Sequence, residues 1–223
     1  MQQNLAPDPS DEQEFFVSRY AVKTALYEQL KSALAERISP LFVTGMPGSG
    51  KTTVLQLLEH DWSASGKLTC LVPLQTIYRE SDLISSLQHC LLGSEAIPQG
   101  HRPVVVRSSG SEALHSIVDL IRSLPSKPLI LLDGLDETRN PELILSFVRL
   151  ISEDSNTLVV VTGRTSPPES AGARVFKHIL TTQAFTRSDI MELIKLVNPR
   201  LELNDAQLGH LYELIHGSPL MAR

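Results

Sequence analysis

The sequence predicts an α/β fold: a three-layer sandwich with a mainly parallel five-stranded sheet, followed by a small C-terminal helical lid subdomain. Two observations predict the sandwich. The strand-like segments are continuous apolar runs, such as Leu129–Leu132, which is typical of strands buried on both faces. Segments with the spacing of amphipathic helices separate these runs. The lid is predicted because two helical segments follow Ala184 with no strand between them.

The chain divides into three parts. Residues 1–14 carry four acidic and no basic side chains, contain Pro7 and Pro9, and are predicted to be a flexible acidic lead. Residues 15–183 contain the strands and helices of the sandwich, and residues 184–223 contain the lid.

Apolar runs and capping residues place the elements in order. The expected strands are Leu41–Val43, Leu68–Leu74, Leu129–Leu132, Thr157–Thr162 and Val175–Leu180. Helices are expected over 21–38, from the glycine-rich turn to about Trp62, from Ser81 or Asp82, from Ser111, from the pair Asn140 and Pro141, over 188–197 and over 204–215. Residues 93–110 contain three glycines and two prolines and are expected to form a loop with at most one short strand.

The composition fits one α/β domain with a small appendage. The chain has 223 residues, of which 42% are apolar. Four of the 25 acidic residues lie in residues 1–14, which leaves 21 acidic against 20 basic residues elsewhere, so no nucleic acid is expected as the main ligand. Cys70 and Cys90 are expected to be reduced, buried thiols. No secretory signal and no membrane-spanning run is evident, so a cytoplasmic protein is expected.

The most informative segment is a glycine-rich turn between a strand and a helix. It reads Gly45, Met46, Pro47, Gly48, Ser49, Gly50, Lys51, Thr52 and Thr53. Glycines with the spacing Gly-x4-Gly-Lys-Thr let successive N–H groups turn toward a phosphate at a helix N-terminus. Lys51 is predicted to bind the β- and γ-phosphates, and the Thr52 hydroxyl to bind Mg²⁺. The segment therefore predicts a phosphate-binding loop for ATP or ADP with Mg²⁺.

A second candidate site follows the apolar run Leu129–Leu132. Asp133 lies at the carboxyl end of that strand, where open α/β sheets bind ligands, and is predicted to hold Mg²⁺. Gly134 leaves room beside the metal. Asp136 and Glu137 add two carboxylates at the strand tip, and either could orient the attacking water.

A third candidate site is Arg164, which follows the run Leu158–Thr162. A guanidinium at this strand tip would stand beside the γ-phosphate, sense it and stabilise charge during its loss. A fourth candidate segment is His216–Leu220, which could instead serve only to end a helix.

These four features in this order resemble the NACHT branch of the STAND nucleoside triphosphatases, the signalling ATPases of immune and cell-death receptors. The most specific part is Asp133-Gly134-Leu135-Asp136-Glu137, because the small residue after the metal aspartate separates NACHT proteins from most other P-loop families. The resemblance covers about residues 15–223. It implies that the strand ending at Thr162 lies between the phosphate-loop strand and the Asp133 strand.

The resemblance also implies contacts and partners that the spacing alone does not. Phe16 and Val17 would meet the adenine, although the family usually has glycine where this chain has Ser18. Pro219 would close over the nucleotide from the lid, and Arg164 matches the first sensor of the family. Family members continue into a winged-helix domain and a repeat sensor, and many carry an effector domain in front. Since the sequence ends shortly after Pro219, the lid is expected to be truncated and these domains to be missing or supplied by separate partner proteins.

Three functions are compatible with these residues. The favoured one is a slow ATP hydrolase that acts as a nucleotide-controlled oligomerisation switch and self-associates in its ATP state. A small-molecule P-loop kinase would need an arginine-rich lid, yet the residues after Ala184 include only Arg187, Arg200 and Arg223. An AAA+-like remodelling ATPase would need an arginine finger across a ring interface; Arg174 or Arg187 could serve, but nothing in the sequence singles them out. A GTPase is disfavoured because no Asn is followed by Lys.

Overall fold

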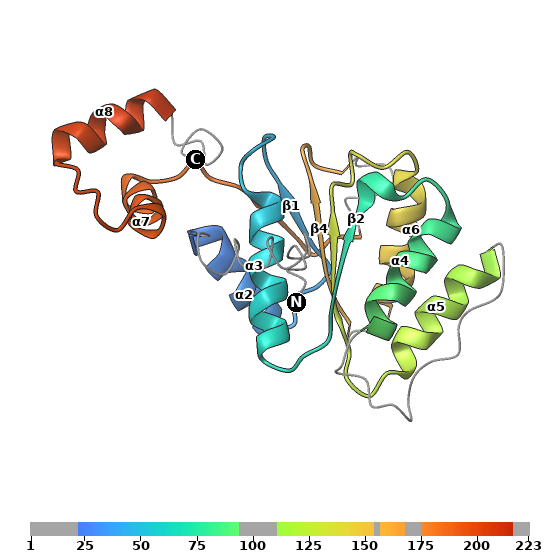
Figure 1. The fold of residues 1–223 in the computed structure, drawn as a ribbon. Coiled ribbons are helices and arrows are strands. Elements are labelled where there is room, and N and C mark those ends of the chain that lie inside the picture. Colours follow the sequence, from blue (N-terminus) through green and yellow to red (C-terminus); the bar gives the residue numbers. More distant parts are fainter. Residues whose placement is uncertain (1–21, 94–110, 154–156, 168–174, 216–223) are drawn as a thin grey trace, which may run out of the picture.

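The computed structural model describes residues 22–93, 111–153, 157–167 and 175–215 (Figure 1). A five-stranded sheet with the order β2-β3-β4-β1-β5 forms the centre, and every strand pair in it is parallel. The strands are β1 (Leu41–Thr44), β2 (Thr69–Pro73), β3 (Leu129–Asp133), β4 (Leu158–Gly163) and β5 (His178–Thr181). The predicted position of β4 between β1 and β3 is confirmed.

Helices flank the sheet and follow it. They are α2 (Ala25–Ala35), α3 (Lys51–Ala64), α4 (Glu80–Gly93), α5 (Ser111–Ser123), α6 (Pro141–Ser152), α7 (Arg187–Val197) and α8 (Asp205–Ile215), with a short 3₁₀ helix η1 (Leu74–Thr76). The predicted cap of α6 is confirmed, because the Asn140 side chain accepts a hydrogen bond from the Leu143 N–H at 3.2 Å and Pro141 follows it.

Several predicted boundaries are wrong. Helix α2 is shorter at both ends than the predicted 21–38. Helix α4 begins before Ser81, and the Asp82 carboxylate reaches back to accept the N–H groups of Tyr78 and Arg79 at 3.0 and 2.8 Å. Asp82 is therefore the third residue of the helix, not its cap. Strand β5 begins at His178, three residues later than the apolar run Val175–Leu180 suggests, although the Lys177 N–H still donates a hydrogen bond to the Pro40 carbonyl at 2.9 Å.

The sheet is buried on both faces, which explains its continuous apolar runs. Helices α2 and α3 pack on one face, over Leu41, Val43 and Val160. Helices α4, α5 and α6 cover the other face, over Phe42, Val159 and Val161 (Figure 1). Successive side chains of β1 thus point into the two cores in turn. Because both faces of the strand are buried, Leu41, Phe42 and Val43 are all apolar. Cys70 is buried and Cys90 half-buried, both as free thiols.

Helices α7 and α8 form the lid beyond β5 and lie to one side of α2 and α3 (Figure 1). Thr186 begins α7 with a capping box, in which Thr186 and Asp189 exchange side-chain and backbone hydrogen bonds. Within the lid, the guanidinium of Arg187 lies 5.7 Å from the centre of the Tyr212 ring. None of the helices in the described ranges has the length and apolar character needed to cross a membrane.

A buried tyrosine fastens α2 to α3. Tyr27 is fully buried, and its hydroxyl donates a short hydrogen bond to the carboxylate of Asp61. The Lys23 ammonium pairs with the same carboxylate at 2.9 Å. Burial, and then the neighbouring carboxylate, raise the pKa of Tyr27 well above its usual value, so the phenol stays protonated and remains a donor.

We predict that the ring of Tyr27 stabilises the fold more than its hydroxyl does. Tyr27→Phe should lower the free energy of unfolding by about 1 kcal/mol, because Asp61 keeps its ion pair with Lys23. Tyr27→Ala should lower it by about 3–5 kcal/mol, because a cavity opens between α2 and α3. Urea unfolding of the two variants tests this; equal losses would show that the hydrogen bond dominates.

Candidate active site

The phosphate-binding loop connects β1 to α3 at the carboxyl edge of the sheet. Gly48 and Gly50 adopt left-handed backbone angles, with φ of 75° and 87°, which other residues resist. Gly45 has no space for a side chain, because a Cβ there would lie 1.8 Å from the Thr182 hydroxyl oxygen. The loop thus needs its glycines both for its turn and for its contact with the segment after β5.

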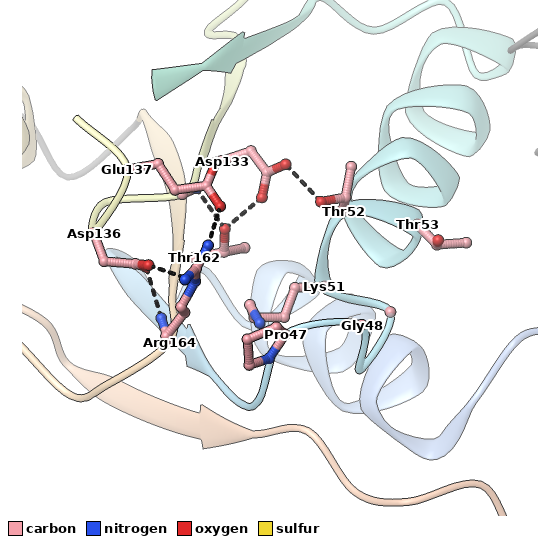
Figure 2. A pocket seen from close by; sticks show the side chains of 12 residues that line it. Pro47, Gly48, Lys51, Thr52, Thr53, Asp133, Asp136, Glu137, Thr162 and Arg164 are labelled. Atoms are coloured by element: carbon pink, nitrogen blue, oxygen red, sulfur yellow. Dashed lines mark hydrogen bonds and ion pairs between the residues drawn. The ribbon is translucent and has the colours of Figure 1, made fainter. Parts of the chain in front are cut away.

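Lys51 is the first residue of α3, and its ammonium lies at the mouth of the loop (Figure 2). It donates hydrogen bonds to the carbonyl oxygens of Gly45 at 2.6 Å and Met46 at 2.9 Å. Burial lowers the pKa of this ammonium, although the nearby carboxylates of Asp136 and Asp133 favour its charged form. A cation held in this way can exchange backbone carbonyls for phosphate oxygens without leaving the loop.

Asp133, the predicted metal ligand, joins three elements (Figure 2). Its Oδ2 accepts a hydrogen bond from the Thr52 hydroxyl of α3 at 2.7 Å, and its Oδ1 accepts one from the Thr162 hydroxyl of β4 at 2.5 Å. The Thr162 hydroxyl also accepts the N–H of Gly134 at 2.9 Å. Both predicted metal residues therefore meet, and Thr162 fixes the carboxylate from the other side.

This donor set fits Mg²⁺. A carboxylate and a hydroxyl are hard oxygen ligands, and Mg²⁺ is usually bound by one or two protein groups together with water and substrate phosphates. Within the described ranges, no group of three or more His, Cys, Asp or Glu side chains could hold a metal. Such a site suits an ion that arrives with the nucleotide and takes its remaining ligands from phosphate and water.

Arg164 is paired with both acidic residues of the β3–α6 loop (Figure 2). Its Nε lies 2.9 Å from Asp136 Oδ2, and one terminal nitrogen lies 3.0 Å from Glu137 Oε1. Its backbone N–H donates to Asp136 Oδ1 at 2.7 Å. The fold brings these three residues together at the carboxyl edge of the sheet. The sequence does not predict that Arg164 pairs with the two carboxylates.

One pocket of about 230 Å³ collects these groups at the tips of β1, β3 and β4. Its lining includes most of the predicted residues: Pro47, Gly48, Gly50, Lys51, Thr52, Thr53, Asp133, Asp136, Glu137 and Arg164. Gly45, Met46 and Ser49 belong to the same loop but do not line it, and Met46 is 76% exposed. Phe16, Val17 and Pro219 lie outside the described residues.

Sequence reasoning missed Thr162. This residue is fully buried although its side chain is polar, and it follows three valines near the end of β4. The register of β3 and β4 pairs Leu132 with Val161, so the next residues, Asp133 and Thr162, lie side by side. A hydroxyl near the end of an apolar strand, beside an aspartate predicted to bind metal, is the signal that could have identified it.

Sequence reasoning also missed a second pocket next to the first, with which it shares Gly50 and Thr53. Its walls come from α2, the phosphate-binding loop, the segment 182–186 after β5, and α7. Apolar side chains such as Val22, Leu26 and Leu193 line it together with hydroxyl groups. The Ser49 hydroxyl in this wall is buried and makes no hydrogen bond to the described part of the chain. An apolar pocket with a few polar groups suits a flat heterocycle and a sugar.

The parallel sheet, the loop at a helix N-terminus and the aspartate bonded to its threonine define a P-loop nucleoside triphosphatase, a class that generally binds ATP or ADP with Mg²⁺. The family model for the NACHT domain matches residues 39–197. The chain therefore belongs to the NACHT family of P-loop nucleoside triphosphatases. A comparison with curated protein sequences gives no match.

Solved structures share the fold at low sequence identity. A STAND protein (Signal Transduction ATPase with Numerous Domains) with a tetratricopeptide repeat sensor from Pyrococcus horikoshii is 15% identical, with a TM-score of 0.63, over 92% of this chain and 30% of that one. The Thermotoga maritima RuvB Holliday junction branch migration motor is 18% identical, with a TM-score of 0.52, over 88% and 58%. The Aeropyrum pernix Orc1 protein, solved with DNA, is 18% identical, with a TM-score of 0.56, over 93% and 59%. The chain spans less than two thirds of each of these proteins, and the likeness shows the fold alone.

We predict that Lys51→Ala lowers the affinity for both ADP and ATP by about ten- to a hundredfold, because it removes a charge-assisted hydrogen bond to phosphate. Calorimetric titration measures this. The matched control is Lys195→Ala, which removes an exposed lysine of α7. Equal nucleotide binding by a folded Lys51→Ala protein and this control would contradict the phosphate-loop assignment.

We predict that Asp133→Asn removes the contribution of Mg²⁺ to ATP affinity but leaves ATP binding in EDTA unchanged. Asparagine keeps an oxygen that can accept a hydrogen bond from Thr162 but loses the charge that attracts the metal. Titrations with and without Mg²⁺ test this, with the 74%-exposed Asp119 changed to Asn as control. A metal dependence that survives in Asp133→Asn would place Mg²⁺ elsewhere.

Proposed function

We propose that this protein is an ATP- and ADP-binding signalling ATPase that uses slow hydrolysis to reset a nucleotide-controlled oligomerisation switch. One observation carries the proposal: groups suited to phosphate, Mg²⁺ and the γ-phosphate converge on one pocket, which adjoins a second pocket walled by the lid. A nucleotide that filled both pockets would contact the sandwich and the lid together. Nucleotide identity could therefore bias the position of the lid.

The chemistry follows from the residues of the first pocket. The loop N–H groups and Lys51 would bind the β- and γ-phosphates, and Thr52 with Asp133 would hold Mg²⁺, which neutralises charge on the phosphate oxygens. A carboxylate from the pair Asp136 and Glu137 would orient the attacking water. Arg164 would stabilise negative charge on the γ-phosphate as the bond to ADP breaks.

The second pocket would hold the adenosine. Its apolar wall from α2 and α7 can sandwich a base, and hydroxyl groups such as those of Ser49 and Thr182 can meet the sugar or the α-phosphate. Because α7 supplies Asp189 and Leu193 to this wall, a bound base would attach the lid to α2. This arrangement would link nucleotide binding to the geometry of the lid.

The kinase alternative lacks support from the lid. A kinase lid brings arginines to the transferred phosphate. Arg187 instead stacks against Tyr212 inside the lid, Arg200 is exposed after α7, and neither lines the first pocket. The remodelling-ATPase alternative receives no specific support either, because the RuvB and Orc1 likenesses concern the fold alone.

The partners follow from the family. The matched STAND protein carries a tetratricopeptide repeat sensor. We propose that this core works with a winged-helix domain, a repeat sensor and an effector domain, on the same or on separate chains, in a cytoplasmic immune or cell-death type of signalling. Self-association in the ATP state is the output that such an arrangement would need.

We predict that a non-hydrolysable ATP analogue with Mg²⁺ shifts the protein toward oligomers, whereas ADP leaves it monomeric. Size-exclusion chromatography with light scattering measures the mass in each state, at one protein concentration. The Lys51→Ala variant is the control, since it should not respond to either nucleotide. Identical masses with the analogue and with ADP would contradict the switch while leaving nucleotide binding intact.

A further inference from the structure

Asp136 and Glu137 are neighbours in the sequence but make different contacts (Figure 2). Both oxygens of Asp136 contact Arg164. Its Oδ1 accepts a hydrogen bond from the backbone N–H at 2.7 Å, and its Oδ2 lies 2.9 Å from Nε. Glu137 contacts that guanidinium through Oε1 alone, which accepts a hydrogen bond at 3.0 Å. Its Oε2 accepts no hydrogen bond from the described residues. The Asp136 side chain is 27% exposed and the Glu137 side chain 39%.

The hydrogen bond from the Arg164 backbone N–H restricts the orientation of the Asp136 carboxylate. The main chain of Arg164 is held on both sides, its N–H by Asp136 and its carbonyl oxygen by the Thr44 hydroxyl at 3.1 Å. The Asp136 carboxylate could change its orientation only by releasing this N–H and the guanidinium together. Its carboxylate therefore sets the position and direction of Arg164.

The Glu137 carboxylate lies against Gly134, next to Asp133 in the sequence. Gly134 has a left-handed backbone with φ of 83°, and a Cβ there would lie 3.2 Å from both Cδ and Oε2 of Glu137. The Glu137 carboxylate thus occupies the space that any side chain after the metal aspartate would fill. The small residue at position 134 makes room for this carboxylate beside Asp133.

We infer that Asp136 is a positioning residue for Arg164 and that Glu137 is the catalytic base. This inference rests on the proposed ATPase function and settles the choice that the sequence leaves open. In the reaction, a lone pair of the water oxygen forms a bond to the γ-phosphorus, and the bond from that phosphorus to the bridging oxygen breaks, its electrons leaving with ADP. One water proton passes to Glu137 and from there to solvent.

The shared guanidinium also controls the base. The γ-phosphate would compete with Glu137 for the terminal nitrogen of Arg164, while Asp136 keeps the Nε and the backbone N–H. Glu137 is then released when ATP is present and restrained when the γ-phosphate is absent.

The test compares single-turnover ATP hydrolysis in four variants: Glu137→Gln, Asp136→Asn, Arg164→Ala and the double variant Asp136→Asn with Arg164→Ala. Glu137→Gln should slow the reaction about a hundredfold or more at unchanged ATP affinity. Asp136→Asn should slow the wild-type protein but change the rate of Arg164→Ala by less than about twofold, because it acts through the arginine. A hundredfold effect of Asp136→Asn in the Arg164→Ala background, or a normal rate in Glu137→Gln, would overturn the assignment.

A binding measurement separates positioning from a general structural effect. Asp136→Asn and Arg164→Ala should both reduce the preference for a non-hydrolysable ATP analogue over ADP, whereas Glu137→Gln should keep that preference or strengthen it. Glu142→Gln on the exposed first turn of α6 and Arg149→Ala on its last turn are the matched controls. An unchanged preference in Asp136→Asn, with Arg164→Ala impaired, would overturn the positioning role.

The two experiments also separate this inference from the proposed function. If the wild-type protein binds both nucleotides but never hydrolyses ATP, the ATPase proposal and the role of Glu137 are wrong. A matched loss of ATP preference in Asp136→Asn and Arg164→Ala would still support the positioning role. If the wild-type protein binds neither nucleotide, the proposed function and the inference are both wrong.

Discussion

The hydrogen bond between Thr52 and Asp133 holds the site together. It joins the first turn of α3, which starts in the phosphate-binding loop, to the end of the central strand β3. Thr162 holds the second oxygen of the same carboxylate from β4. Because all strands run in one direction, their carboxyl ends share one edge of the sheet, and these short side chains can meet there without long loops.

Apolar packing behind this edge of the sheet holds Thr52 and Asp133 at hydrogen-bonding distance. Helix α3 covers Leu129 and Leu131 with Leu55 and Leu58, so its first turn is placed by a core that excludes water. On the opposite face, Phe42 and Phe176 pack at 5.0 Å between ring centres. Gly163 lies against Phe42, and a Cβ at that position would come within 2.7 Å of its ring. The chain can therefore turn from β4 into Arg164 only if residue 163 lacks a side chain.

The sequence predicts those parts of this arrangement that depend on local spacing. The phosphate-binding loop, the aspartate at the end of β3 and the Asn140 cap each follow from a few adjacent residues, and the sheet follows from its continuous apolar runs. Thr162 and the pairing of Arg164 with Asp136 could not be predicted in the same way, because they depend on the register between β3 and β4. The second pocket is built from segments that lie far apart in the sequence, between Val22 and Leu193, so no local pattern announces it.

The contact between Gly45 and Thr182 limits how the lid can move. Thr182 continues the pairing of β5, since its N–H donates to the Thr44 carbonyl at 2.8 Å, and its side chain fills the space over Gly45. Helix α7 is fixed from Thr186 onward by its capping box. If the lid moves as proposed, its hinge would therefore lie in Gln183, Ala184 and Phe185, which also line the second pocket. A base bound there would contact the hinge itself. A small change in the angle between the sandwich and the lid would then move the far end of α8 by a much larger distance.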